Sequence, residues 1–169
     1  MNTWKIDPVH SEIKFKVKHL VISTVTGTFD KFDGEIESEN DDFTDSRVSF
    51  SADINSINTR NQQRDGHLKS ADFFDAASHP KLSFVSKTFN KKQVAENEFE
   101  MTGDMTIRGV TKEITLEVTH NGNAAGMDGS KMAGFEISGK LNRYDFGLEW
   151  NAVTEAGGLA VGKDITIEI

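Results

Sequence analysis

Alternation of apolar and polar residues is the feature that most constrains the fold of this chain. Ile13, Phe15 and Val17 alternate with three lysines, so one face of this segment is apolar and the other is charged. Successive side chains of a β-strand point to opposite faces, so the pattern predicts a half-buried strand. The same pattern predicts eight strands, at 13–19, 32–38, 48–54, from 82 past 89, 99–107, 114–118, 133–141 and 161–169, with Lys163 interrupting the last apolar face.

The connections between these runs fit an antiparallel all-β domain. Residues 108–111 predict a tight turn, and residues 121–130, with three glycines, predict a long mobile hairpin loop. Only residues 58–75 depart from the alternation. Residues 61–65 are polar, and Leu68 and Phe73-Phe74 after them supply an apolar side, so we expect one short helix here. No repeat or interdomain linker interrupts the chain, so we expect a single domain over residues 1–169.

Eight strands can pack as a sandwich or close as a barrel. A barrel of this size has an interior that side chains fill or that holds one small ligand. The predicted inward positions mix large residues with small ones, which favours a barrel with room inside. The small residues are Gly34, Ser38, Ala52, Gly103 and Gly139.

Phenylalanine dominates the aromatic residues, with 12 Phe against 2 Trp and 1 Tyr. Phe adds apolar area without a hydrogen-bonding group, so a chain built this way has either a very apolar core or an apolar cavity. Because the Phe residues are spread over at least six of the predicted segments, we favour a long apolar cavity.

The net charge of −8 argues against a nucleic-acid partner, since nucleic-acid affinity depends largely on Lys and Arg. Residues 30–45 hold eight acids against Lys31 alone, a local charge of −7, so the charge belongs to one strand face and its loop. No basic segment with a following apolar run begins the chain, and no apolar run is long enough to span a membrane. We therefore expect a cytoplasmic location and no stable membrane insertion.

Catalytic and metal-binding patterns are weak. The absence of cysteine excludes thiolate chemistry, and the five histidines lack metal-ligand spacing, so neither a metal nor another cofactor is expected. Asp7, His10 and Ser11 are triad residue types, but they lie within five residues and fit a turn with capping side chains. No nucleophile elbow or phosphate-binding loop is present.

Arg64, Asp65 and His67 form the densest group of functional residue types. One interpretation is an ion pair and cap that fix the predicted helix over a barrel end, and the other is a polar mouth for a ligand head group. His19, at the end of an apolar strand face, is either a hydrogen-bonded core histidine or a polar contact at the cavity rim. The adjacent rings of Phe73 and Phe74 cannot both face one core, so we expect at least one to plug a barrel end or meet a partner.

Six segments resemble the YceI-like family, a lipocalin-like group of bacterial proteins described as polyisoprenoid-binding. They follow the family's order and cover the chain nearly end to end: WKIDPVHSEIKFKVKHL (4–20), VTGTFDKFDGEI (25–36), RDGHLKSADFFD (64–75), HPKLSFVS (79–86), MTIRGVTKEITLEV (105–118) and LNRYDFGLEW (141–150).

The resemblance implies an extended eight-stranded antiparallel lipocalin-like barrel with one short helix near its mouth. It also implies an elongated apolar pore for a prenyl or similar long-chain lipid, and a homodimer. The chain departs from the family in two places. It lacks the secretion signal of many members, and Lys163-Asp164 stands where the family commonly has an acidic pair.

We therefore predict non-catalytic binding, sequestration or transport of a long-chain isoprenoid or related amphiphile, such as a polyprenyl quinone, a polyprenol or a fatty amide or acid. The alternatives are an enzyme that acts on a lipid in the same pore through Arg64, Asp65 and His67, and an interaction protein with an incidental cavity. Head-group contacts are expected from Arg64, His67 or His19. The remaining predicted ligand contacts are Phe15, Val17, Phe29, Phe32, Ile36, Phe50, Ile54, Leu68, Phe73, Phe74, Phe84, Met105, Ile107, Phe135, Phe146, Leu148 and Trp150.

Overall fold

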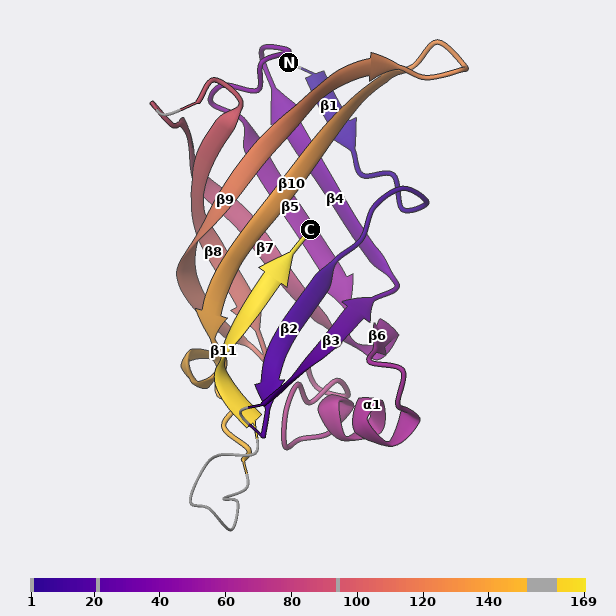
Figure 1. Cartoon of the computed structure of the whole chain (residues 1–169), viewed down its shortest axis with the longest axis vertical. Helices are drawn as coiled ribbons and strands as arrows, with labels where there is room; N and C mark the ends of the chain where they lie inside the picture. The colour runs from indigo at the N-terminus through magenta and orange to yellow at the C-terminus, as the bar shows by residue number, and fades with distance from the viewer. Residues whose placement is uncertain (1, 21, 94, 152–160) are drawn as a thin grey trace.

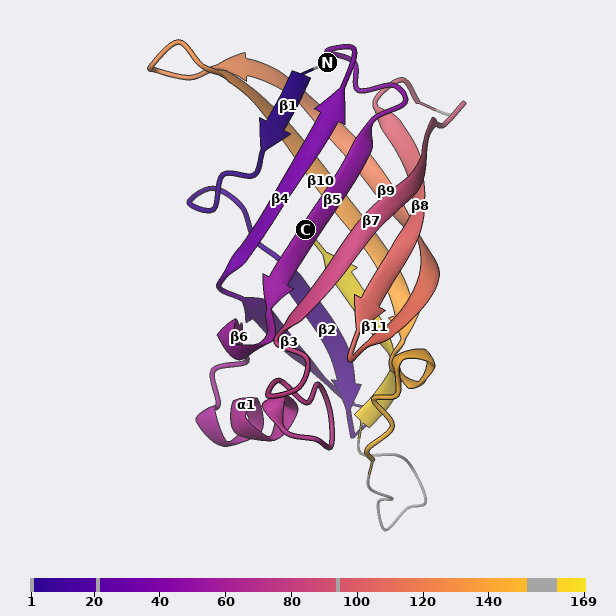
Figure 2. The ribbon, with the colours of Figure 1, turned by 180° about the vertical axis from the view of Figure 1, so that it is seen from behind.

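A computed structural model describes residues 2–20, 22–93, 95–151 and 161–169 of the chain. Its strands form one antiparallel sheet that curls into a half-barrel, with one α-helix across an end (Figures 1 and 2). The all-β class is confirmed, and the described residues form one short α-helix, as predicted. The elements are β1 (Asn2–Lys5), β2 (Lys14–His19), β3 (Ser23–Phe29), β4 (Phe32–Ser38), β5 (Arg47–Asp53), η1 (Ile54–Ser56), β6 (Ile57–Asn58), α1 (Gln62–Lys69), β7 (Lys81–Lys91), β8 (Glu98–Ile107), β9 (Val110–Ala125), β10 (Lys131–Asn142), η2 (Arg143–Phe146) and β11 (Val161–Glu168).

The prediction of eight strands is wrong, because the described residues form a sheet of 11 in the order β1-β4-β5-β7-β8-β9-β10-β11-β2-β3-β6. β1 and β6 are short edge strands without an alternating pattern. β3 does alternate, but Gly27 stands at its central inward position. Gly27 pairs with Phe15 of β2, and the Phe15 ring fills the space that a side chain on β3 would occupy.

The sheet stays open where a closed barrel was predicted. β11 pairs with β10 only at Ser138–Asn142, and Ile169 adds two backbone hydrogen bonds to Ile137. The upper part of β10 pairs with β9 on its other side, and no described strand joins it to β1. A gap along the wall of the half-barrel therefore separates β1 and β4 from β10.

β11 explains why Lys163 interrupts an apolar run. Val161 pairs with His19 and Ile165 with Val17, so three residues of β11 lie between the two pairs where β2 has one. This irregularity places Lys163 and Asp164 at the surface and returns Ile165 and Ile167 to the inner face. A β-bulge is the usual way in which a strand accommodates extra residues.

The two predicted hairpins differ in outcome. The tight turn is confirmed, since Ile107 pairs with Val110 across Arg108 and Gly109, both with positive φ, as a two-residue hairpin turn requires. The long loop over residues 121–130 is shorter than predicted. β9 and β10 stay paired as far as Ala125 and Lys131, so residues 126–130 alone connect them.

Helix α1 lies within the predicted segment 58–75. The Asn61 side chain accepts a hydrogen bond from the Arg64 amide at 3.0 Å, which caps the first turn. At the other end, the Ser70 amide donates to the carbonyl of His67. The chain then turns back beneath one end of the half-barrel (Figure 1), and this returning segment contains Phe73 and Phe74.

Candidate functional site: an inner cavity and a lateral groove

The inner cavity lies between the curled sheet and the segment that follows α1, and its volume is about 100 Å³. Its wall is almost entirely aliphatic and aromatic, because the apolar faces of strands from both halves of the sheet converge on it. The wall consists of Ile13, Lys14, Phe15, Val17, Phe29, Phe50, Leu68, Phe73, Phe74, Leu82, Met105, Ile107, Leu141, Arg143, Phe146, Leu148, Val161, Ile165 and Ile167.

Lys14 and Arg143 are the two charged residues in that wall. The Lys14 ammonium pairs with Glu12 at 3.1 Å and is partly exposed, so its stem rather than its charge borders the cavity. Arg143 is only 3% exposed, and burial lowers its pKa from the ordinary value. The inner cavity therefore suits an apolar chain.

The Arg143 side chain joins two stretches of backbone, 148–150 and 161–162, at the closed end of the cavity. Its Nε donates to the Gly162 carbonyl at 2.8 Å, and its Nη1 donates to the carbonyls of Leu148 at 2.7 Å and Trp150 at 2.8 Å. Its Nη2 donates to the Val161 carbonyl at 3.2 Å. Among the described residues no carboxylate pairs with it, so carbonyl dipoles and aromatic faces surround the charge.

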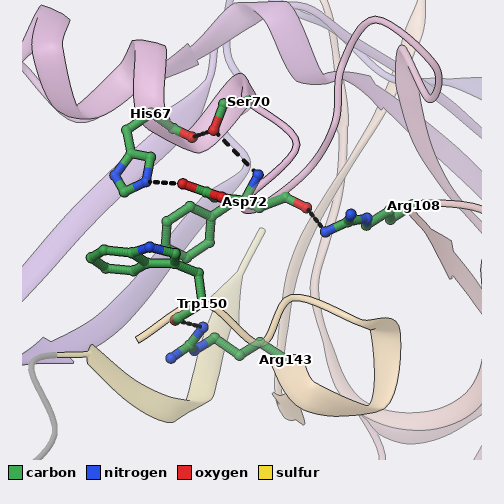
Figure 3. Close-up of polar contacts among 7 residues, drawn as sticks. His67, Ser70, Asp72, Arg108, Arg143 and Trp150 are labelled. Atoms are coloured by element: carbon green, nitrogen blue, oxygen red, sulfur yellow. Dashed lines mark hydrogen bonds and ion pairs between the residues drawn. The ribbon is translucent and has the colours of Figure 1, made fainter. Parts of the chain in front are cut away.

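Aromatic rings close this end of the cavity (Figure 3). The Phe73 ring lies 5.4 Å from Trp150 and 5.1 Å from His67, measured between ring centroids, and His67 lies 4.6 Å from Trp150. His67 Nε2 lies within hydrogen-bonding distance of Asp72 Oδ2, at 2.9 Å, and Arg108 Nη1 donates to the Phe73 carbonyl at 2.8 Å. These contacts hold Phe73 as a plug, one of the two roles predicted for the adjacent rings.

The second opening, here called the lateral groove, runs along the gap between β10 and the pair β1 and β4, and its volume is about 990 Å³. Trp4, Ile36, Met132, Phe135 and Ile137 contribute its apolar surface. Polar residues from β1, the following loop, β4, β5, the β9–β10 connection and the start of β10 border it as well. These residues are Asn2, Thr3, Lys5, Asp7, His10, Glu35, Ser49, Asp128, Ser130 and Lys131.

Ile13 and Phe50 belong to both the inner cavity and the lateral groove. The two spaces therefore meet at these side chains, and the apolar wall continues from one to the other. The volume of the groove lies within the range typical of small-molecule sites, whereas that of the cavity lies below it. The groove supplies most of the room, and the cavity extends it toward α1.

A loop with its own hydrogen bonds forms one rim of the lateral groove. His10 Nδ1 and Asp7 Oδ2 are 2.8 Å apart, and the Val9 amide donates to Asp7 Oδ1 at 3.0 Å. These two hydrogen bonds hold the pKa of Asp7 below its ordinary value. The ionised carboxylate thus favours the folded loop at neutral pH, and that contribution is lost as the pH falls through the lowered pKa.

The predicted chemical cluster does not converge on a cavity. Arg64 donates to Thr59 through Nε and Nη2, both at 2.8 Å, and Asp65 accepts from the Thr59 amide at 2.9 Å and from the Thr59 hydroxyl at 2.5 Å. His67 instead pairs with Asp72. Arg64 and Asp65 therefore both hydrogen-bond to Thr59 and stabilise the start of α1, while the His67 ring packs against Phe73.

Eleven of the predicted contacts line the inner cavity: Phe15, Val17, Phe29, Phe50, Leu68, Phe73, Phe74, Met105, Ile107, Phe146 and Leu148. Ile36 and Phe135 line the lateral groove, as does Phe50. Phe84 lies behind the wall, fully buried and stacked on Phe50 at 5.1 Å, and Ile54 is buried in η1. Neither space is lined by Phe32, Ile54, Phe84, His19, Arg64, His67 or Trp150.

Sequence reasoning missed several wall residues. Ile13, Leu82, Leu141, Ile165 and Ile167 lie in predicted runs, and the alternation that identified those strands also marks them as inward-facing. Trp4 and Met132 were missed for a different reason. Trp4 lies on the edge strand β1 and Met132 on β10, and these two strands face each other across the gap in the sheet. The position of that gap is not encoded by any local sequence pattern.

The described residues offer neither a metal site nor a membrane-spanning helix. No group of three or more His, Asp or Glu side chains within residues 2–20, 22–93, 95–151 and 161–169 is arranged to hold a metal ion. In the same part of the chain, no helix has the length and apolar character needed to cross a bilayer.

A curled antiparallel sheet around an apolar cavity, with a helix across one end, defines a lipocalin-like protein. The chain belongs to the YceI-like family, because the model of the YceI-like domain matches residues 4–169. It is 38% identical over 169 residues to UPF0312 protein SAS2572 of Staphylococcus aureus, covering 99% of this chain and 95% of that protein.

Solved structures agree with the fold. The YCEI protein of Campylobacter jejuni is 34% identical and has a TM-score of 0.75, with 100% of this chain and 95% of that chain covered. A polyisoprenoid binding domain from Saccharophagus degradans has a TM-score of 0.60 at 15% identity, covering 93% of this chain and 89% of that one. The second likeness concerns the fold alone.

Gly27→Ala should reduce stability by about 1–3 kcal/mol, the usual range for overpacking. A Cβ atom at position 27 would collide with the ring of Phe15, which would have to move within the cavity wall. Urea denaturation measures the effect. The matched control is Gly66→Ala in α1, where nothing lies within 4 Å of the new methyl group and no loss of stability is expected. Equal stability of the two variants would contradict the packing described for Phe15.

Proposed function

We propose that the protein binds a long-chain isoprenoid or a related amphiphilic lipid without chemical conversion, and so sequesters or carries it. The observation that carries the proposal is the continuous apolar wall that joins the lateral groove to the inner cavity through Ile13 and Phe50. An elongated ligand with an apolar chain fits such a joined space better than a compact polar substrate does.

The energetics of burial favour this class of ligand. Each buried CH₂ group contributes roughly 0.8 kcal/mol, so a long chain gains substantial free energy from contact with an apolar wall. Ordering the chain and losing its free motion offset part of that gain. Phe and Met residues such as Phe15, Phe74 and Met105 supply adaptable apolar contact and leave no polar group unsatisfied in the wall.

Membership of the YceI-like family supports lipid binding, and the Saccharophagus degradans domain with a related fold is itself a polyisoprenoid binding domain. A catalytic alternative would need Arg64, Asp65 and His67 to surround one ligand atom. Arg64 and Asp65 instead bond to Thr59, and His67 bonds to Asp72. A binding role is therefore the better supported proposal. The homodimer and the cytoplasmic location stay predictions.

Organic extraction of the freshly purified protein, followed by mass spectrometry, tests the proposal. We expect a co-purifying polyprenyl quinone, polyprenol, or fatty amide or acid, and uptake of an added prenyl quinone by the extracted protein. Recovery of no lipid together with no uptake would overturn the proposal.

Val17→Phe should reduce that uptake, because Val17 lines the inner cavity of about 100 Å³ and the larger ring would occupy much of it. Val85→Phe is the matched control, since Val85 is 59% exposed on β7 and lines neither space. Uptake of the prenyl quinone by each folded variant is measured by mass spectrometry after removal of free ligand. Equal uptake by the two variants would place the ligand outside the inner cavity.

A further inference from the structure

The two ends of the joined space differ in polarity. At the α1 end, the Arg143 guanidinium donates to four backbone carbonyls, so it does not offer its charge to a ligand. Lys14, which follows Ile13 at the junction of the two spaces, pairs with Glu12. Phe73 and Phe74 close the α1 end with apolar rings. A polar head group placed there would lose its hydrogen bonds to water and find no replacement.

The opposite end contains an unsatisfied donor. The indole Nε1 of Trp4 is buried and has no hydrogen-bond acceptor among the described residues. Buried polar groups are rarely left without a partner, so each exception asks for an explanation. Trp4 lines the lateral groove, and its ring packs against Phe43 at 5.1 Å between centroids. A ligand in the groove would lie beside this indole.

Other polar groups border the same part of the groove. Asn2, on the same face of β1 as Trp4, lines the groove, and His10 lines it from the adjoining loop. His10 uses Nδ1 in its contact with Asp7, and among the described residues no hydrogen bond involves its Nε2. The groove therefore offers hydrogen-bonding groups beside an apolar surface, which is what the polar end of an amphiphile requires.

We propose that the lipid binds in one fixed orientation, with its polar end beside Trp4 in the lateral groove and its apolar chain directed past Ile13 and Phe50 toward Phe73. The head group carries a hydrogen-bond acceptor, such as a carbonyl oxygen, that receives the Trp4 N–H. This inference rests on the proposed function, since it assigns the ends of the same ligand.

The chain contains only 2 tryptophans, and they lie at opposite ends of the space. Trp4 belongs to β1 at one end of the half-barrel, and Trp150 lies by α1 at the other (Figures 1 and 3). Trp150→Phe leaves Trp4 as the single indole, and Trp4→Phe leaves Trp150. Each variant thus reports on one end through its fluorescence.

The probes are two forms of one long-chain fatty amide, with bromine either beside the amide or at the far end of the chain. Bromine quenches tryptophan fluorescence on close approach. We expect the head-brominated amide to quench Trp4 more strongly, and the tail-brominated amide to quench Trp150 more strongly. The reverse pattern, or equal quenching of each indole by both probes, would overturn the proposed orientation.

A second measurement tests the hydrogen bond itself. Trp4→Phe should weaken binding of the amide by roughly fivefold, as expected for one lost hydrogen bond, and leave binding of a hydrocarbon of equal length nearly unchanged. Equal weakening of both ligands would overturn the role of the Trp4 N–H. Uptake by the unmodified protein is measured separately by mass spectrometry. Failure of both amides to bind there would overturn the proposed function, whereas uptake with the wrong quenching pattern would overturn the orientation alone.

Discussion

Replacing Arg143 by methionine should lower the free energy of unfolding by about 3 kcal/mol or more. The substitution removes the donor for the carbonyls of Leu148, Trp150, Val161 and Gly162, and a buried acceptor without a donor is costly. Methionine fills similar space but donates nothing. Urea denaturation followed by far-ultraviolet circular dichroism gives the difference in stability.

Arg47→Met provides the control, because Arg47 is exposed on β5 and the same charge is removed without a buried network. We expect its stability to remain within about 0.5 kcal/mol of the unmodified protein. Arg143→Lys retains the charge but loses the planar fork of donors, so it should fall between the two. A loss below about 1 kcal/mol for Arg143→Met would show that these carbonyls find other donors, such as water.

The second large effect is expected at the aromatic plug. Phe73→Ala should cost about 3–5 kcal/mol in stability, since the ring is 5% exposed and its removal leaves a void beside Trp150 and His67. It should also open the inner cavity at the α1 end, so a bound lipid should dissociate faster. Denaturant titration measures the first effect, and transfer of a prenyl quinone to lipid vesicles measures the second.

Phe74→Ala is the natural comparison, because the Phe74 ring also lines the cavity but is only half-buried. Its centroid lies 6.1 Å from that of the Phe29 ring. The stability cost of Phe74→Ala should be clearly smaller. If the two substitutions cost the same, Phe73 would be one wall residue among many rather than the plug. Unchanged lipid release from Phe73→Ala would argue that the chain does not extend to this end.

The fold class could be predicted from the sequence because burial on one face of a strand imposes a period of two. Residues 99–107 obey that period without exception, and β8 occupies Glu98–Ile107. The period fails where a side chain of the partner strand fills an inward position, as the Phe15 ring does beside Gly27. It also fails where a bulge changes the register, as between Val161 and Ile165.

The openness of the sheet could not be predicted in the same way. Closure depends on whether β10 finds a second neighbour along its whole length, and β11 pairs with it only at Ser138–Asn142. Pairing of this kind is a property of the whole topology, so neither the alternation nor the turn residues encode it. The lateral groove and the position of Trp4 in it follow from that one long-range feature.

Most of the predicted ligand contacts lie in the cavity wall, because that wall follows from inward-facing strand positions and from Phe73-Phe74. That they contact a ligand stays a prediction. The head-group contacts proposed for Arg64 and His67 were a weaker inference, since residue type alone does not say which acceptors lie nearby. Arg64 donates hydrogen bonds to the Thr59 hydroxyl and carbonyl. Donors that are already bonded to a neighbouring residue in this way are not available to a ligand.

The gap between β1 and β10 changes how a long molecule can enter. A closed ring of strands admits a chain only end first, so its bore limits the width of whatever passes through it. A seam along the wall lets the part of a chain that lies in the lateral groove enter sideways, so a wide ring or a branch at that end need never pass through a narrow opening. Only the part that reaches into the inner cavity must then move lengthwise as the ligand enters or leaves.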